Sequence, residues 1–272
     1  MNARVGDDVR PRWCAGRLLQ RHIFPDGSVR VQRSPCYRYE YSAEAIMNQT
    51  GNSPSSNQWA AWHDFHYLCD TTRWQKIVAR MELVRKVRDV PGDIVDAGAY
   101  KGSSTLQFAH LLNIYQPNSR SRVIAFDTFD AVFPRVRHDE AQAAVDHMES
   151  YESSAYDQLT GAVGELGLAS RISIVRGDIT DTLPKFLVDN PGMRISLLHC
   201  DLDVYPPTLV TLQAAWQRLV IGGIAVFDEY AVEKWGESDA VDEFFGKMET
   251  PPKLKMLDTS PTPTAYCTKV HH

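Results

Sequence analysis

The chain has 272 residues, 43% of them hydrophobic and 23% charged, which suits one large globular domain or a domain with an extension. Its formal net charge of −5 argues against a general nucleic-acid binder, which would carry a basic excess. We find no apolar run long enough to span a membrane and expect no signal peptide. Five scattered cysteines without a C-x-x-C pair predict reduced thiols in a cytoplasmic protein.

The first 57 residues are basic and show little periodicity. We expect an N-terminal extension that packs on the domain or on a neighbouring subunit of a homo-oligomer; a lid that helps to bind substrate is the alternative. From Trp59 the pattern becomes helical, and a second helix is expected from Thr71 to Val87, where apolar residues recur at helical spacing. These helices lead into the main domain, residues 58–272.

A glycine-rich loop follows the first predicted strand of that domain. Ile94 and Val95 are apolar and β-branched, as in a short buried strand, and Asp96 follows them. The loop 97–102 comes next, and Ser103 opens an amphipathic helix. Glycines let the backbone approach a ligand closely, and a helix N-terminus offers free N–H groups, so this unit predicts a nucleotide-like ligand.

The spacing of the loop indicates which ligand. The segment DAGAYKG lacks the middle glycine of a dinucleotide loop, and Lys101 precedes Gly102, so the order of a P-loop is not met. The remaining pattern, acidic-x-Gly-x-x-x-Gly, is similar to motif I of S-adenosylmethionine (SAM) methyltransferases. An ordinary strand-loop-helix turn is the alternative.

Two further strand ends complete the predicted cofactor site. The second strand, residues 122–126, ends at Asp127, which lies 25 residues after Gly102 and is placed to accept hydrogen bonds from ribose hydroxyls. The third strand, residues 172–175, is followed by Asp178, which either contacts adenine or caps the next helix. The residues expected to contact SAM are Asp96, Gly98, Ala99, Tyr100, Gly102, Ser103, Ser104, Asp127, Thr128, Gly177 and Asp178.

Between the second and third strands, residues 129–169 show helical pattern but no strand. We interpret this long insertion as a probable lid over the site.

Carboxylates follow the fourth and fifth strands. Residues 195–200 lead into Asp201 and Asp203, and residues 224–227, after a glycine turn, lead into Asp228 and Glu229. Asp201 and Asp203 are two positions apart, so an extended chain points both to one side.

Together these elements predict an α/β fold with a doubly wound, Rossmann-like sheet of order 3-2-1-4-5. Two final strands, about 253–258 and 264–269, would add a C-terminal antiparallel hairpin. In that order the ends of strands one, four and five lie side by side at the ligand-binding edge.

So many carboxylates cannot all stay ionised close together without a cation, and a hard divalent ion with oxygen ligands is the natural partner. The alternative is that some are turn residues or helix caps. That applies above all to Asp203, which lies just before Pro206 and Pro207.

The segments DLDVYPPT, LVIGGIAVFDEY and WGESDAVDEFF resemble the macrocin O-methyltransferase (TylF-like) family, and the resemblance covers roughly residues 72–248. It implies SAM-dependent methylation of a sugar hydroxyl in antibiotic biosynthesis, assisted by a divalent metal. The family usually has two aspartates where this chain has Asp228 and Glu229. Magnesium is the first expectation, with manganese as an alternative, and the longer glutamate adds a larger ion such as calcium to the alternatives.

The resemblance assigns the metal to Asp201, Asp228 and Glu229, and makes Asp203 the catalytic base or a fourth ligand. His199 and His63 are weaker candidates for the base. A catechol-type methyltransferase is an alternative function, but residues 204–217 lack the lysine that such enzymes generally keep after the first metal aspartate. A non-catalytic SAM- or nucleotide-binding module is the third hypothesis.

Overall fold

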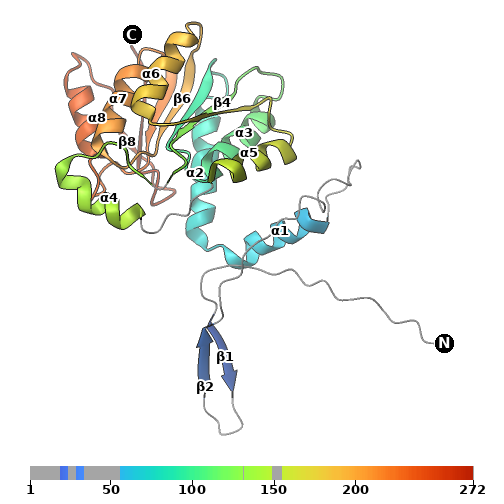
Figure 1. The fold of residues 1–272 in the computed structure, drawn as a ribbon. Helices are drawn as coiled ribbons and strands as arrows, with labels where there is room; N and C mark the ends of the chain where they lie inside the picture. Colours follow the sequence, from blue (N-terminus) through green and yellow to red (C-terminus); the bar gives the residue numbers. More distant parts are fainter. Residues whose placement is uncertain (1–18, 24–28, 34–55, 131, 149–154, 272) are drawn as a thin grey trace. The chain divides into compact units, whose positions relative to one another are not determined.

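The computed structural model describes residues 19–23, 29–33, 56–130, 132–148 and 155–271. It divides into two compact units, Met1–Ala61 and Trp62–His272, and this division lies within helix α1 (Ser56–Leu68) (Figure 1). In the first unit β1 (Leu19–Ile23) and β2 (Val29–Arg33) pair antiparallel. Sequence analysis missed this ribbon, although Asp26-Gly27 is a turn dipeptide and Val29 and Val31 alternate with polar residues. The remainder of the predicted extension lies outside the described residues.

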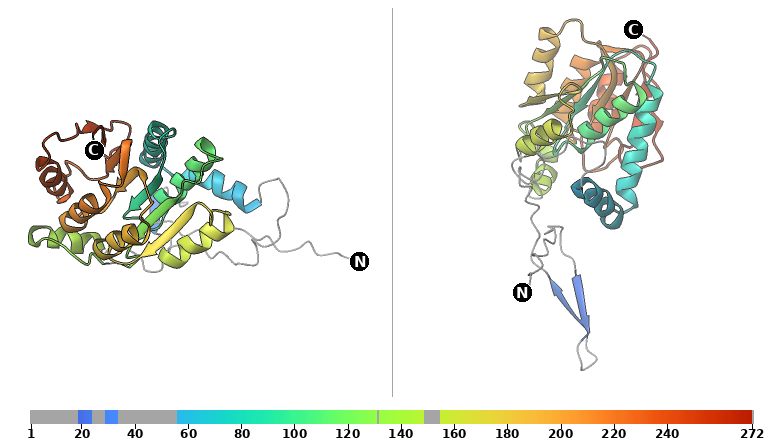
Figure 2. Two further views of the ribbon diagram at one scale, coloured as in Figure 1. Left: turned by 90° about the horizontal axis from the view of Figure 1, so that it is seen from above. Right: turned by 90° about the vertical axis from the view of Figure 1, so that its right-hand side faces the viewer.

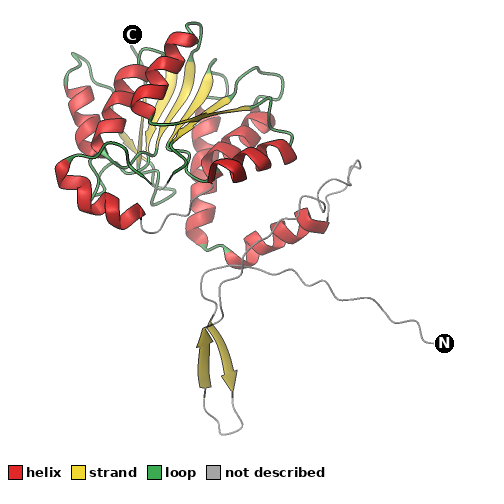
Figure 3. Ribbon diagram, viewed as in Figure 1, coloured by secondary structure: helices red, strands yellow, loops and turns green. Residues whose placement is uncertain are grey.

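The second unit is built on a seven-stranded sheet of order β5-β4-β3-β6-β7-β9-β8 (Figure 3). Its strands are β3 (Asp93–Ala97), β4 (Val123–Asp127), β5 (Ile172–Arg176), β6 (Ile195–Cys200), β7 (Leu219–Phe227), β8 (Lys255–Met256) and β9 (Ala265–Thr268). The first five strands in this order run parallel, and β9 lies antiparallel between β7 and β8. The predicted α/β fold, strand order and C-terminal antiparallel hairpin are confirmed.

Helices cover both faces of this sheet, as two further views show (Figure 2). They are α2 (Thr71–Lys86), α3 (Ser103–Tyr115), α4 (Ala141–Met148), α5 (Ala155–Glu165), α6 (Ile179–Asp189), α7 (Tyr205–Ala215) and α8 (Glu237–Gly246), with a short 3₁₀ turn η2 (His138–Glu140). Successive strand residues serve opposite cores, because side chains alternate along a strand. Ile94 packs with α2, α3 and α5, whereas Val95 packs with α6, α7 and α8.

Strand β7 begins earlier than predicted. Gly222 and Gly223, which sequence analysis interpreted as a turn, lie inside it, and the pairing with β6 shifts register nearby. Gly222 has φ +84°, and a Cβ atom on Gly223 would lie 2.9 Å from the carbonyl oxygen of Ser196. The two glycines therefore mark an irregularity within a strand, as glycines in strands often do.

The insertion 129–169 contains two parts with different roles in the fold. Leu159 and Val163 of α5 are buried in the core beside α3, because parallel strands β4 and β5 need a crossover helix between them. Residues 132–148, which hold η2 and α4, are not part of that crossover. Only this shorter segment is left as a candidate lid.

Within the described residues, no helix has both the length and the apolar character needed to cross a membrane. Cys69, Cys200 and Cys267 are free thiols, and the last two are buried. Cys14 and Cys36 lie outside the described residues.

Candidate functional site

A cavity of about 610 Å³ lies beyond the carboxyl ends of the parallel strands. Its lining comes from the glycine loop after β3 and from the segments that follow β4, β5, β6 and β7. A hollow of about 860 Å³ lies at the amino ends of the strands, and none of the predicted site residues line it. Ligands bind at the carboxyl edge of doubly wound sheets, so the first cavity is the candidate site.

Most of the predicted site residues meet in this cavity. Those that line it are Gly98, Ala99, Tyr100, Ser103, Ser104, Asp127, Thr128, Gly177, Asp178, Asp201, Asp203, Asp228 and Glu229. Asp96, Gly102, His199 and His63 are not among its lining residues.

The glycine loop contains three residues with positive φ, namely Gly98, Gly102 and, between them, Tyr100 at φ +48°. Gly98 has φ +90° and its N–H donates to the carbonyl oxygen of Phe126 at 2.9 Å. Gly102 has φ +82°, and its N–H donates to the carbonyl oxygen of Ala99 at 2.7 Å, which closes the turn before α3. Glycine adopts the angles of Gly98 and Gly102 without strain, and Gly98 brings its backbone to the cavity wall.

Asp127 fixes the loop from the neighbouring strand. Its carboxylate accepts hydrogen bonds from the backbone N–H of Tyr100 at 2.8 Å and of Phe129 at 2.6 Å. Burial raises the pKa of Asp127 despite these two hydrogen bonds. Each carboxylate oxygen has a second lone pair, so Asp127 still has acceptor capacity for a ligand.

Asp178 caps a helix, which is one of the two roles that the sequence left open; its contact with adenine stays a prediction. One carboxylate oxygen caps α6 by accepting from the Thr180 N–H at 2.9 Å, while the other accepts from Arg135 Nε at 2.8 Å. Asp178 also lines the cavity. Arg135 belongs to the segment 132–148, which thus reaches the cavity wall.

Asp96 does not reach the cavity, in contrast to its predicted contact with the cofactor. It lies inside β3, not beyond its end, and its side chain is fully buried. Its oxygens accept from Ser104 Oγ at 2.8 Å and Thr105 Oγ1 at 2.5 Å, and contact His199 Nδ1 at 2.8 Å. Asp96 therefore supports the start of α3 and orients a histidine.

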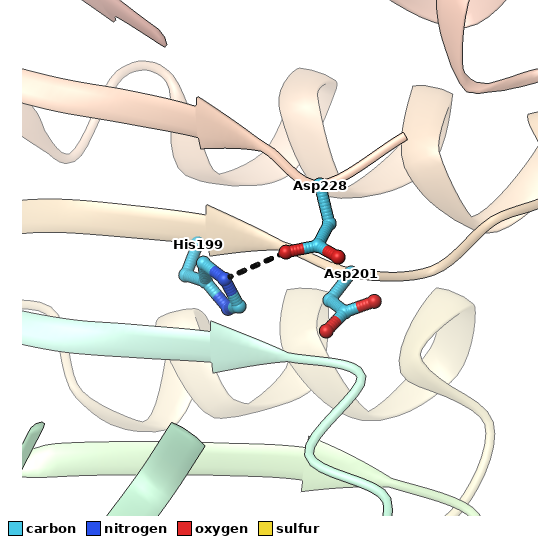
Figure 4. Close-up of side chains that lie close together, drawn as sticks. All are labelled: His199, Asp201 and Asp228. Atoms are coloured by element: carbon cyan, nitrogen blue, oxygen red, sulfur yellow. Dashed lines mark ion pairs between the residues drawn. The ribbon is translucent and has the colours of Figure 1, made fainter. Parts of the chain in front are cut away.

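His199 lies between Asp96 and Asp228. Figure 4 shows its side toward Asp228. Its Nε2 atom lies 3.6 Å from Asp228 Oδ1, and both atoms are buried without a hydrogen-bond partner among the described residues. Burial alone would lower the pKa of His199, but the carboxylates of Asp228 and Asp96 raise it to about 9. The ring is thus positioned between two carboxylates, and sequence analysis had considered it only as a weaker candidate for the base.

The side chains of His199, Asp201 and Asp228 converge so that one ligand atom from each lies within 4.8 Å of the others (Figure 4). Burial and the charge of Asp228 raise the pKa of Asp201. Two ionised carboxylates at this distance, those of Asp201 and Asp228, repel each other, and a bound cation would reduce that repulsion. Glu229, the third predicted ligand, lines the same cavity but is not part of this close group.

Asp203 lies on the turn between β6 and α7. It has φ +60°, a conformation that Asp and Asn tolerate better than most residues. Burial raises the pKa of its carboxyl strongly, and Oδ2 lies 3.8 Å from Nε2 of His147 on α4. The site therefore receives a histidine from the candidate lid, which no local motif had indicated.

Glu237, at the start of α8, holds the two acidic turns together. Its backbone N–H donates to the carbonyl oxygen of Asp203 at 3.2 Å, and its Oε1 accepts from the backbone N–H of Glu229 at 2.8 Å. Glu237 is fully buried. The segment WGES thus connects the turns that carry Asp203 and Glu229. Its sequence alone did not indicate this role.

Three basic residues of α2 also line the cavity: Arg73, Lys76 and Arg80. Lys76 Nζ lies 3.4 Å from Asp228 Oδ2. Sequence analysis treated this helix as core packing, although the spacing of these three residues places them on one face.

Comparison with known proteins identifies the family. The family described as "Macrocin-O-methyltransferase (TylF)" matches residues 39–263, which is most of the chain. The chain belongs to this family. The resemblance that DLDVYPPT and the neighbouring motifs suggested is therefore confirmed.

Individual relatives agree with this membership. A 4′-O-methyltransferase of a rhamnosyl-tetracenomycin from Streptomyces olivaceus is 27% identical over 62% of this chain, and the match spans 64% of that protein's length. Demethyldecarbamoylnovobiocin O-methyltransferase from Streptomyces niveus is 24% identical over 84% of this chain and 85% of its own.

Among solved structures, CalS11, a calicheamicin methyltransferase, has a TM-score of 0.69 at 28% identity and covers 80% of this chain and 87% of its own. A second structure of CalS11 describes it as a TDP-rhamnose 3′-O-methyltransferase. These similarities support the fold described above.

Proposed function

We propose that this protein transfers a methyl group from SAM to a hydroxyl of a sugar, free as a nucleotide sugar or attached to a natural product, in antibiotic or related secondary metabolism. Family membership supports O-methyl transfer, and two relatives named above act on rhamnose-type sugars. The observation that carries the proposal is the single cavity in which a motif I loop meets the carboxylates of Asp201, Asp203 and Asp228.

The cofactor fits the β3–β4–β5 side of this cavity. Asp127 would accept hydrogen bonds from the ribose hydroxyls, and Asp178 would contact the adenine. The loop 98–104 would carry the amino-acid end of SAM, because Gly98, Ser103 and Ser104 line this part of the cavity. Asp96 would act indirectly, by holding Ser104 and Thr105 at the start of α3.

The acidic group fits a divalent cation. The buried, unpartnered Oδ1 of Asp228 and the close approach of Asp201 form a donor set of the kind that hard cations bind. We assign Asp201, Asp228 and Glu229 to the metal, with His199 and Asp96 orienting Asp228 from behind, as supporting groups of metal ligands do. Magnesium is the first choice, and manganese or calcium are alternatives. When bound, such an ion would lower the pKa of the acceptor hydroxyl.

The remaining groups would position the reactants and move one proton. The acceptor oxygen would form a bond to the methyl carbon as the bond from that carbon to sulfur breaks, which leaves neutral S-adenosylhomocysteine. Asp203 would take the hydroxyl proton, because its carboxylate lines the cavity two residues beyond Asp201. Residues 132–148, which contribute Phe133, Arg135 and His147 to the lining, would exclude water as a lid.

Calorimetric titration of SAM tests the cofactor part of the proposal. Asp127→Asn should weaken binding by about 1.5–3 kcal/mol, the usual worth of hydrogen bonds to a charged group. Asp189→Asn, at the end of α6 and away from the cavity, is the matched control and should bind like wild type. Equal affinity of the two variants would remove Asp127 from the site.

The expected homo-oligomer stays a prediction, which light scattering of the purified protein would test.

A further inference from the structure

We propose that Arg80 binds the α-carboxylate of the amino-acid end of SAM. The proposal rests on the proposed function and adds to it a recognition residue that the glycine-loop motif does not contain. Arg80 lies on α2, about 20 residues before the motif I loop in sequence, and lines the same cavity.

Arg80 is a buried cation near Asp201 and Asp228, where its charge opposes the rise in the pKa of Asp201 and helps to lower the pKa of Asp228, but the described residues offer it no carboxylate in direct contact. Its exposed fraction is 3%, and its Nη1 donates to the neutral amide oxygen of Gln107 at 3.1 Å. Its Nε atom is buried with no hydrogen-bond partner, and no carboxylate in the described part of the chain forms an ion pair with Arg80. An arginine stays charged at any ordinary pH, and a buried charge is costly unless it is paired. The guanidinium therefore lacks a directly hydrogen-bonded carboxylate, which a ligand can supply.

The position of Arg80 matches one end of the cofactor. The adenosine would lie over Asp127 and Asp178, at the ends of β4 and β5. From there the amino-acid end must extend toward the end of β3 and the start of α3. Arg80 is hydrogen-bonded to Gln107 of α3 and lines the cavity together with Gly98 and Ser104.

The chemistry of a carboxylate suits this residue. A guanidinium presents a planar fork of N–H donors that matches the two oxygens of a carboxylate. Lys76 is a less suitable partner because its ammonium group already lies 3.4 Å from Asp228. Arg73 is exposed, whereas Arg80 lies deep in the protein. The buried position beside Gln107 of α3 favours the cofactor over a diphosphate of the acceptor, because the loop proposed to carry the amino-acid end of SAM adjoins the start of that helix.

Calorimetry with three ligands tests this inference. S-adenosylhomocysteine carries the carboxylate, its decarboxylated analogue lacks only that group, and 5′-methylthioadenosine lacks the whole amino-acid end. Wild type should bind S-adenosylhomocysteine at least about tenfold more tightly than the decarboxylated analogue, as expected for a charged hydrogen-bonded pair. Arg80→Gln should lose that preference while binding 5′-methylthioadenosine as wild type does, which also shows that the variant is folded. Arg80→Lys should retain part of the preference.

Arg85→Gln is the matched control, because Arg85 is an exposed arginine of the same helix that does not line the cavity. It should behave as wild type with all three ligands. The inference would be overturned if Arg80→Gln kept the full preference for S-adenosylhomocysteine over its decarboxylated analogue. It would also be overturned if Arg80→Gln lost binding of thymidine diphosphate but bound S-adenosylhomocysteine as wild type does, because Arg80 would then serve the acceptor. Failure of wild type to bind any of the three adenosine ligands would instead refute the proposed function itself.

Discussion

Gly98 lies so close to Asp201 that a Cβ atom on the glycine would be 1.7 Å from the carbonyl oxygen of the aspartate. The Asp201 N–H in turn donates to the carbonyl oxygen of Ala97 at 2.8 Å. The loop proposed to carry SAM and the residue proposed to hold the metal are therefore in direct backbone contact. This contact fixes the distance between the two halves of the site.

Gly98→Ala should disrupt this contact. The added methyl would collide with main-chain atoms that cannot rotate away, and φ +90° would strain the new residue. We expect the free energy of unfolding to fall by about 2 kcal/mol or more, with loss of SAM binding, measured by chemical denaturation and calorimetry. Gly161→Ala is the control, because Gly161 lies within α5 with open space around it. Alanine there should stabilise by up to about 1 kcal/mol. Equal behaviour of the two variants would contradict the account.

Asp203→Asn should separate proton transfer from metal binding. Asparagine keeps the shape and tolerates φ +60°, but it cannot take a proton. We expect kcat to fall by about 10²–10⁴-fold while the metal affinity stays close to that of wild type. Steady-state kinetics across a metal titration would measure both. If excess metal restores Asp203→Asn, then Asp203 is a ligand, and His147 or His199 becomes the next candidate for the base.

Asp228→Asn is the counterpart of that variant. It removes a carboxylate from the group shown in Figure 4, so metal affinity should fall and part of the activity should return at high metal concentration. Glu229→Asp restores the usual pair of the family and should keep activity, with a preference shifted toward magnesium. Wild-type metal affinity in Asp228→Asn would exclude Asp228 as a ligand.

Much of the fold could be predicted because each element carried its own local signal. Strand β6, for example, is an unbroken buried run that ends at Cys200, just before Asp201, and Gly98 marked the loop. The β6–β7 pairing was harder, because Gly222 indicates a turn and a strand irregularity equally well. The partners of Asp96 were not predictable, since His199 is distant in sequence and meets it only through the register of β3 and β6.

The residues that sequence reasoning missed at the site share a different cause. Arg80, His147 and Glu237 come from helices whose local pattern predicts only packing. Tertiary packing brings them to the cavity or behind it. The one available signal was a basic residue, Arg80, among the apolar positions of a predicted amphipathic helix.

Asp178 should give a pH-dependent contribution to stability. Burial opposes its ionisation, but the hydrogen bonds from Arg135 and Thr180 lower its pKa below the ordinary value of 3.8. A carboxyl with a lowered folded pKa stabilises fully above its unfolded pKa, and this stability is lost as the pH falls through the folded pKa. The free energy of unfolding should therefore be higher for wild type than for Asp178→Asn near pH 7, by about 1 kcal/mol or less because Arg135 is half exposed.

Chemical denaturation of both proteins from pH 7 downward would measure this difference. It should shrink only below about pH 3.8. A difference that already disappears between pH 7 and pH 5 would be inconsistent with a lowered pKa.

Glu140 should hold the candidate lid to the domain. Its buried carboxylate accepts from the backbone N–H of Gly236 at 2.6 Å, of Tyr205 at 2.9 Å and of Arg137 at 3.3 Å. Glu140→Gln replaces one acceptor oxygen by a donor and should cost about 1.5–3 kcal/mol. Hydrogen exchange should then increase in residues 132–148. Glu165→Gln, at the exposed end of α5, should change neither quantity, and an equally small effect of Glu140→Gln would show that the anchor is unimportant.

The most direct test of the account is transfer of a trideuterated methyl group from labelled SAM to TDP-rhamnose and to rhamnosylated natural products, followed by mass spectrometry and NMR of the product. The account predicts that the label appears on a sugar oxygen, that exhaustive EDTA treatment abolishes the transfer, and that magnesium, manganese or calcium restores it. Full turnover after EDTA treatment, or label on carbon or nitrogen instead of a sugar oxygen, would contradict it.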